Sequence, residues 1–309
     1  MKAIIGAVGV VAVGVLAWVI FGMSHSGMET KMKETPKISV VTSFYPLYFF
    51  AHRIGGDKAD VTNITPAGSE PHDYEPTPQD MAKIEKSQLV VLNGGHLEAW
   101  GDDVEKNIDP KNTAIVVAGE GLTTQQVEEE GETITDPHVW LSPLLAEKMV
   151  DKITEGFVKA DMGNKDYYQA NGSALKQDLA RLDTAYRSGL TSCQSKDIIT
   201  SHAAFGYLAT TYGLNQVPIA GLSPDAEPSS QELIDIAAFA KKNNVKYIFF
   251  ESLVSPKLAQ TVATEVGAQT LVLNPIEGLT DEELAENKTY LTEMQSNLDH
   301  LKIALRCNQ

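Results

Sequence analysis

The sequence predicts an α/β protein made of two lobes, each with a mainly parallel sheet flanked by helices, joined by one long rigid connecting helix. Short apolar, often β-branched runs alternate with stretches of helical apolar spacing, first over residues 38–92 and again after residue 190. This alternation is typical of parallel sheets covered by helices. Between the two regions, apolar side chains recur at helical spacing without an intervening proline, at Leu175, Leu179, Leu182 and Tyr186. With 309 residues and 43% hydrophobic content, the chain is long enough for two domains.

The first lobe is predicted over residues 38–164. Its expected strands are short apolar runs bounded by turns, at 38–43, 61–64 and 89–92. Two helices are expected from apolar residues at helical spacing, at 45–55 and 78–86. Glycine-rich turns end the first helix and the third strand, at Gly55-Gly56-Asp57 and Asn93-Gly94-Gly95.

The second lobe is predicted over residues 191–309, after a linking helix at 165–190. Its expected strands are at 197–200, 216–220, 247–250 and 270–273. Its expected helices are at 203–212, 230–243, 256–266 and 281–305, and Gly267 is a natural stop for the third of them. A single helical connector limits how far two lobes can close on each other, unlike the flexible strands of a hinged binding protein.

The N-terminal segment predicts export. Lys2 precedes an uncharged apolar run over residues 3–23, which at about 1.5 Å per residue is long enough to cross a bilayer core. Residues 1–23 are therefore expected to be a signal-anchor or a signal peptide. The length of the run favours an uncleaved anchor in the cytoplasmic membrane, although Ser24-His25-Ser26 offers small residues for cleavage. Residues 24–37 are polar and are expected to be a flexible spacer to an extracytoplasmic domain, in the periplasm or at the cell surface.

Charge and cysteine content exclude some function classes. The formal net charge of −16 repels nucleic acid and attracts cations. The two cysteines, Cys193 and Cys307, lie outside any C-x-x-C pattern, so they are poor zinc-cluster candidates. In an oxidising compartment they could form a disulfide, contributing on the order of 4 kcal/mol in the chain-entropy model. No sustained heptad pattern suggests assembly, so a monomer is expected.

Three histidines indicate a metal site. His72, His138 and His202 stand in separate polar or proline-edged segments, so far apart in sequence that only the folded chain could bring them together. Imidazole with a carboxylate is a ligand set that Zn²⁺ prefers, and Ca²⁺ and Mg²⁺ prefer oxygen ligands. Taken singly, each histidine could instead serve packing or hydrogen bonding at the end of a loop.

The chain resembles the metal-specific solute-binding proteins of zinc and manganese ABC transporters over residues 38–305. The motifs that carry the resemblance are Val41-Thr42-Ser43-Phe44-Tyr45-Pro46, Pro66-Ala67-Gly68-Ser69-Glu70-Pro71-His72-Asp73-Tyr74-Glu75-Pro76-Thr77-Pro78, Asn93-Gly94, Asp136-Pro137-His138-Val139-Trp140-Leu141 and Thr200-Ser201-His202-Ala203-Ala204-Phe205-Gly206-Tyr207.

The resemblance implies the identity of the ligands. His72 and His138 match the first two metal ligands of the family. The third position holds histidine in zinc-type members and glutamate in many manganese-type ones; here it is His202, which favours zinc. The matching fourth ligand is Glu277. Glu251 is its competitor at the end of a predicted strand, and we assign it the task of orienting a ligating imidazole; a carboxylate bonded to backbone amides is the alternative.

The function implied by the resemblance is extracytoplasmic, high-affinity capture of Zn²⁺ as cargo and its delivery to the membrane subunits of an ABC permease. A manganese or iron carrier of the same fold is an alternative. A zinc hydrolase is a third possibility, with the same histidines, an open fourth position, and Glu251 or Glu277 as general base. The absence of H-E-x-x-H, G-x-S-x-G and P-loop motifs argues against an enzyme.

One stretch departs from the family pattern. Zinc-type relatives often carry a histidine-rich acidic loop between the first and second ligand, whereas residues 125–132 are acidic without a histidine. We expect a solvated acidic loop there. The remaining histidines, His25, His52, His96 and His300, are not expected to be primary ligands. His96 follows a Gly-Gly turn at a strand end and is the one that could approach the cleft.

Overall fold

Two parallel sheets of four strands each confirm the predicted fold class. The first sheet has the strand order β2-β1-β3-β4 and the second has the order β10-β9-β7-β8, and all of their strand pairs are parallel. The computed structural model describes residues 36–129 and 131–308. The predicted anchor at 3–23 and almost all of the predicted spacer at 24–37 lie outside the described residues. No helix of the described part is both long enough and apolar enough to cross a membrane.

The first sheet is built from short, buried runs. Its strands are β1 (Ile38–Thr42), β2 (Ala59–Asn63), β3 (Leu89–Leu92) and β4 (Ala114–Val117). The apolar side chains of β3 are buried on both faces of the sheet, which is why its sequence is a continuous apolar run and not an alternating one. The helices between the strands are α2 (Tyr45–Gly55), α3 (Pro78–Lys86) and α4 (Gly101–Asn107), with a 3₁₀ turn η1 (Gly56–Lys58). Strand β4 and helix α4 were not assigned from the sequence.

The second sheet repeats this pattern. Its strands are β7 (Asp197–Thr200), β8 (Asn215–Pro218), β9 (Tyr247–Phe250) and β10 (Gln269–Val272). Its helices are α7 (Gly206–Tyr212), α8 (Ser230–Lys242) and α9 (Lys257–Val266), with the 3₁₀ turn η4 (Ala203–Phe205). Gly267 ends α9 in the left-handed conformation, with a φ of 69°, as expected for a helix stop.

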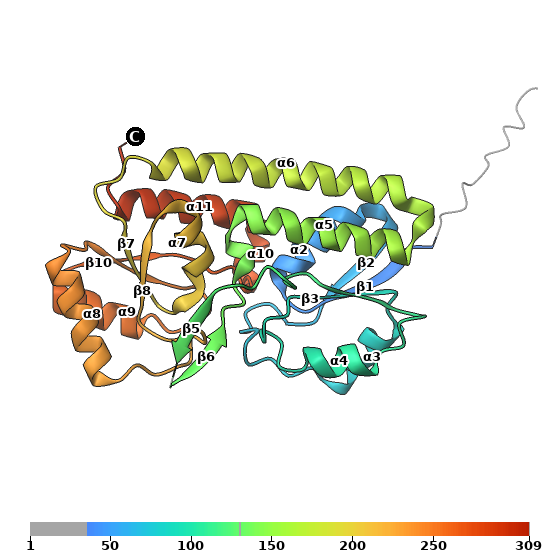
Figure 1. The fold of residues 1–309 in the computed structure, drawn as a ribbon, viewed down its shortest axis with the longest axis horizontal. Helices are drawn as coiled ribbons and strands as arrows, with labels where there is room; N and C mark the ends of the chain where they lie inside the picture. The colour runs from blue at the N-terminus through green and yellow to red at the C-terminus, as the bar shows by residue number, and fades with distance from the viewer. Residues whose placement is uncertain (1–35, 130, 309) are drawn as a thin grey trace, which may run out of the picture. The chain divides into compact units, whose positions relative to one another are not determined.

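A long helix connects the two sheets. Helix α6 (Lys165–Leu190) follows α5 (Pro143–Ala160) and the 3₁₀ turn η3 (Met162–Asn164). It packs against α2 and α5 of the first lobe and against α7 and α11 (Tyr290–Ala304) of the second. Figure 1 shows it extending over both lobes. The buried side chains of α6 include all four residues whose spacing predicted it. The boundaries 164 and 191 between lobes and linker remain predictions.

One apolar core extends through both lobes. It gathers large buried side chains from helices of each, among them Phe50, Phe157, Tyr186 and Tyr290. The Tyr186 hydroxyl donates a 2.7 Å hydrogen bond to the Met294 carbonyl, and a disulfide joins Cys193 to Cys307 near the ends of α6 and α11. A continuous core of this kind disfavours independent motion of the lobes.

Two sequence-based expectations were wrong. The helix predicted over 281–305 is two helices, α10 (Asp281–Ala285) and α11, because Asn287 adopts a left-handed φ of 59° and Thr289 caps a new helix start. The acidic stretch 125–132 is not a loop. It forms most of an antiparallel hairpin of β5 (Gln126–Glu129) and β6 (Glu132–Thr135), in which Val127 pairs with Ile134 and Gly131 supplies the turn with a φ of 84°.

Candidate metal centre

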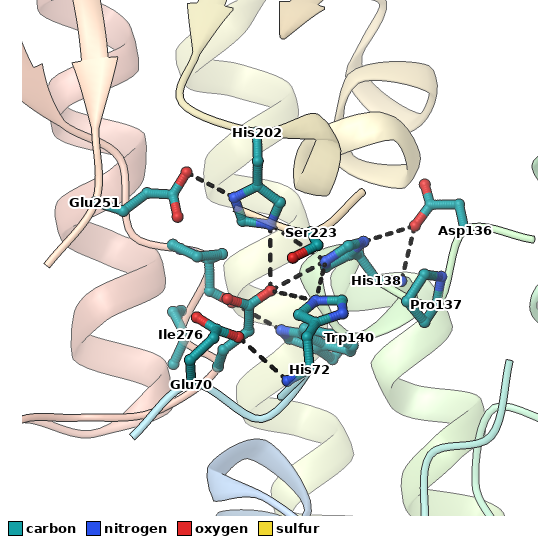
Figure 2. Close-up of polar contacts among 12 residues, drawn as sticks. Glu70, His72, Asp136, Pro137, His138, Trp140, His202, Ser223, Glu251 and Ile276 are labelled. Carbon is teal, nitrogen blue, oxygen red and sulfur yellow. Dashed lines mark hydrogen bonds and ion pairs between the residues drawn. The ribbon is translucent and has the colours of Figure 1, made fainter. Parts of the chain in front are cut away.

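The structure brings His72, His138, His202 and Glu277 together. His72 lies in the loop after β2, His202 lies two residues after the end of β7, and Glu277 lies in the loop after β10. His138 precedes η2 (Val139–Leu141) and α5. Three of the four thus stand beyond the carboxyl ends of parallel strands, where α/β proteins place ligand-binding groups. Figure 2 shows the three imidazoles converging.

The donor atoms have the separations of a tetrahedral site. The Nε2 atom of His138 lies 3.3 Å from Nε2 of His72 and 3.4 Å from Nε2 of His202. Oε1 of Glu277 lies 3.0 Å from Nε2 of His138 and 3.4 Å from Nε2 of each of the other two histidines. In a tetrahedron with metal–ligand bonds of about 2.0–2.1 Å, neighbouring donors are about 3.3 Å apart. The four donor atoms therefore fit around one Zn²⁺ ion.

Two of the imidazoles are oriented by carboxylates on their outer nitrogens. Nδ1 of His202 lies 2.7 Å from Oε1 of Glu251, and Nδ1 of His138 lies 2.8 Å from Oδ1 of Asp136. Asp136 also accepts a 2.9 Å hydrogen bond from the backbone amide of His138. Such contacts fix the ring orientation and direct Nε2 toward the metal. Glu251, which was predicted to orient a ligating imidazole, thus contacts His202, and Asp136 was not assigned from the sequence.

The carboxylates control the pKa values of the buried histidines. Burial disfavours the charged imidazole, but Glu251 and Glu277 together raise the pKa of His202 well above its usual value. At His138, burial again acts to lower the pKa, but Asp136 and Glu277 outweigh it and the pKa is raised. At His72, burial is the larger influence and lowers the pKa. Burial would raise the pKa of Glu277, yet the neighbouring histidines hold it well below the usual range, so Glu277 is ionised.

The loop that carries Glu277 combines a strained backbone angle with several buried hydrogen bonds. Ile276, the residue before it, is buried and has a φ of 59°, a conformation that is rare for a β-branched residue. The Asn274 side chain accepts a 2.7 Å hydrogen bond from the Ile276 amide. Asn297 then bonds both the amide and the carbonyl of Asn274, at 2.8 and 2.6 Å. Surroundings that determine the backbone this completely can sustain such strain, which is concentrated at functional sites.

Trp140 connects the His138 segment to the Glu277 segment. Its indole nitrogen donates a 2.8 Å hydrogen bond to the carbonyl of Pro275, and its side chain is fully buried. The Tyr290 hydroxyl in turn bonds the Trp140 carbonyl. The two halves of the cluster are therefore joined by protein contacts.

Glu70 is a second carboxyl group beside the cluster that the sequence analysis did not assign. Its Oε1 atom accepts a long hydrogen bond of 3.4 Å from the His72 amide. Burial, reinforced by the charge of Glu277, raises the pKa of Glu70 to about 9. Among the described residues, Oε2 of Glu70 and Oε2 of Glu277 are buried without a hydrogen-bond partner. Because Glu277 is ionised, its Oε2 is an orphaned buried acceptor, which points to an electropositive ligand.

Comparison with known proteins gives a consistent set of relatives. A family model described as zinc-uptake complex component A, periplasmic (ZnuA), matches residues 40–304. The chain is 45% identical over 280 residues to the high-affinity zinc uptake system protein ZnuA of Bacillus subtilis, covering 87% of this chain and 88% of that protein. It is 38% identical over 287 residues to the zinc-binding protein AdcA of Streptococcus pyogenes, but spans only 56% of that longer relative. The crystal structure of the Zn(II)-bound ZnuA-like domain of Streptococcus pneumoniae AdcA matches with a TM-score of 0.75 and 40% identity, covering 87% of this chain and 99% of that one.

Proposed function

We propose a zinc-carrying function for this chain, which belongs to the family of periplasmic zinc-uptake components described as ZnuA. The protein binds Zn²⁺ as cargo outside the cytoplasmic membrane and serves as the solute-binding component of an ABC uptake system. It hands the ion to the membrane subunits of that system. The apolar run at residues 3–23 serves as its membrane tether, and the protein acts as a monomer.

The observation that carries this proposal is the set of donor separations. Three imidazole nitrogens and one carboxylate oxygen lie within 4.8 Å of one another. Nε2 of His138 and Oε1 of Glu277 each lie 3.0–3.4 Å from the other donor atoms. We assign His72, His138, His202 and Glu277 as the four ligands. Asp136 and Glu251 orient two of the imidazoles. Nitrogen-rich tetrahedral coordination suits Zn²⁺, whereas Mn²⁺ favours more oxygen ligands in octahedral geometry.

The same geometry disfavours the hydrolase alternative. A catalytic zinc usually has three protein ligands and keeps a fourth position for water. Here Glu277 fills that position, and its ionised, fully buried carboxylate faces all three imidazoles. Glu251, the other candidate general base, is bonded to the outer nitrogen of His202 and so is directed away from the ion. We therefore propose a carrier and not an enzyme.

The test is metal competition on residues 28–309, which include the compact unit that begins at Lys37. Zn²⁺ and Mn²⁺ are titrated against a fluorescent chelator in the parent, in Glu277→Ala and in Glu227→Ala, an exposed glutamate of the second lobe that serves as the control. We expect zinc preference in the parent, at least about tenfold weaker zinc binding in Glu277→Ala, and no change in the control. If Glu277→Ala binds zinc as tightly as the parent, Glu277 is not a ligand and the fourth coordination position is open. That result would favour the hydrolase alternative.

A further inference from the structure

The candidate metal centre is accessible at one edge. His138, His202 and Glu277 are fully buried, with exposures of 0–1%, whereas the side chain of His72 keeps 11% of its surface exposed. Among the four proposed ligands, His72 is therefore the one that an incoming ion meets first. Any group that collects Zn²⁺ for this site must stand on the approach to His72.

A cavity of about 520 Å³ lies on that approach. His72 lines it together with Gly95 and His96 of the first lobe, Glu132 of the β5–β6 hairpin, and Leu222 and Ser223 of the second lobe. His96 and Glu132 are exposed, so the cavity extends from solvent to the edge of the metal centre. It therefore holds, outside the four proposed ligands, an imidazole and a carboxylate, both of which bind Zn²⁺.

The turn that carries His96 is fixed in place. Gly94, Gly95 and His96 have consecutive φ values of 77°, 68° and 65°, all in the left-handed region, which a histidine adopts less readily than a glycine. The buried carboxylate of Glu98 accepts hydrogen bonds from the amides of Asn93 and Gly94, at 2.7 and 3.0 Å. Histidine at a left-handed position of a bonded turn points to a role for its side chain.

The same turn packs against the segment that carries His138. The side-chain amide of Asn93 donates a 3.0 Å hydrogen bond to the Pro137 carbonyl. A Cβ atom at Gly95 would lie 3.4 Å from Cα of Pro137 and 2.9 Å from the Thr123 side chain, so the backbone approaches closely there. The backbone of the turn that carries His96 is thus held against the segment that carries His138.

We propose that this cavity is the entry port for Zn²⁺ and that His96, with Glu132 of the same cavity lining, forms a transient acquisition site that passes the ion to His72. This inference rests on the proposed zinc-carrying function. Two exposed donors bind Zn²⁺ more weakly than four buried ones, so the ion moves inward. The net charge of −16 and the carboxylate of Glu132 attract cations to the port.

An acquisition site has a kinetic signature that a merely solvated histidine lacks. His96 contacts the ion in neither the metal-free nor the final bound state, so its loss must slow association and dissociation by the same factor. The equilibrium affinity then stays constant. A residue of the final site would instead change the affinity, chiefly through the dissociation rate.

The experiment measures Zn²⁺ association by stopped flow, and release to excess chelator, in the full-length protein. The variant is His96→Asn, because asparagine tolerates the left-handed conformation of the turn. The matched control is His52→Asn, at an exposed position of α2. We expect His96→Asn to slow both rates about threefold to tenfold with an affinity within about twofold of the parent, and the control to match the parent.

A second pair of variants tests the charge attraction of Glu132. Glu132→Gln should slow association most at low salt, where charge attraction is strongest, while Glu155→Gln, at an exposed position of α5, should not. Unchanged rates in His96→Asn would overturn the acquisition site, and so would a weakened affinity caused by faster release, because His96 would then belong to the final site. A parent protein that fails to bind Zn²⁺ would instead overturn the proposed function.

Discussion

The segments Glu70-Pro71-His72 and Asp136-Pro137-His138 carry the same order of residue types but differ in structure. In the second segment, the carboxylate of Asp136 lies 2.8 Å from the outer nitrogen of a fully buried histidine. In the first, Glu70 contacts only the amide of a partly exposed histidine, at 3.4 Å, and burial raises its pKa to about 9. The shorter aspartate reaches the imidazole of its own segment. One sequence pattern thus supplies an anchored ligand at one position and an accessible ligand at the other.

The largest effects are expected when His72 and His138 are each replaced by alanine. Either replacement should weaken zinc affinity by roughly two orders of magnitude or more, because structural zinc binding of about 10–16 kcal/mol is shared among four ligands. Stability of the metal-free protein should differ. His138→Ala leaves the buried carboxylates of Asp136 and Glu277 without their charged partner and should cost about 3 kcal/mol, while His72→Ala, which removes a neutral imidazole, should cost about 1 kcal/mol. Urea unfolding with chelator present measures both, and equal losses would contradict the distinction.

The next effect is on pH dependence. The raised pKa values of His138 and His202 mean that their charged forms stabilise the metal-free fold fully below the unfolded pKa of about 6.5, and that this contribution is lost as pH rises through the folded pKa values. Zinc requires neutral imidazole, so zinc affinity changes in the opposite direction.

Zinc affinity should therefore strengthen as pH rises, by about tenfold per pH unit for each proton that the ion displaces. His72, whose pKa is lowered, should lose its proton in more acidic solution and so contribute little to this slope near neutrality. Competition titrations between pH 5 and 8 measure the slope. An affinity that stays constant over this range would exclude imidazole ligation.

The smallest effects on zinc affinity are expected when the carboxyl groups of Asp136 and Glu70 are each replaced by an amide. Asp136→Asn removes the carboxylate that orients His138 and should weaken zinc binding about tenfold, and it should also lower the pKa of His138 and move the pH dependence toward acid. Glu70→Gln replaces a group that is already neutral in the metal-free protein at pH 7, so it should change affinity less than about twofold. Isothermal titration at pH 7 compares the pair. A large loss in Glu70→Gln would show that Glu70 is ionised and takes part in binding the ion.

The local pattern of the chain was sufficient to predict most of the fold. The apolar runs at β1, β3, β7 and β9 and the spacing of Leu175, Leu179 and Leu182 in α6 follow from burial and helical periodicity, which depend on neighbours in sequence. The hairpin at 126–135 was missed because its sequence is acidic and has only one apolar residue in each strand, a composition that is typical of a solvated loop. The last helix was predicted too long because the left-handed turn at Asn287 leaves little trace in an otherwise helical pattern.

The sequence by itself determined which residue types can meet: three histidines in separate segments, two carboxylates after strands of the second lobe, and an acidic chain suited to cations. Only the tertiary structure decided that four donor atoms have the separations of a tetrahedral zinc site, that Asp136 contacts the outer nitrogen of His138, and that burial raises the pKa of Glu70. It also placed His96 beside the one exposed edge of the centre. Distances between donors and the burial that moves a pKa arise from contacts between segments far apart in the chain, and no local pattern encodes them.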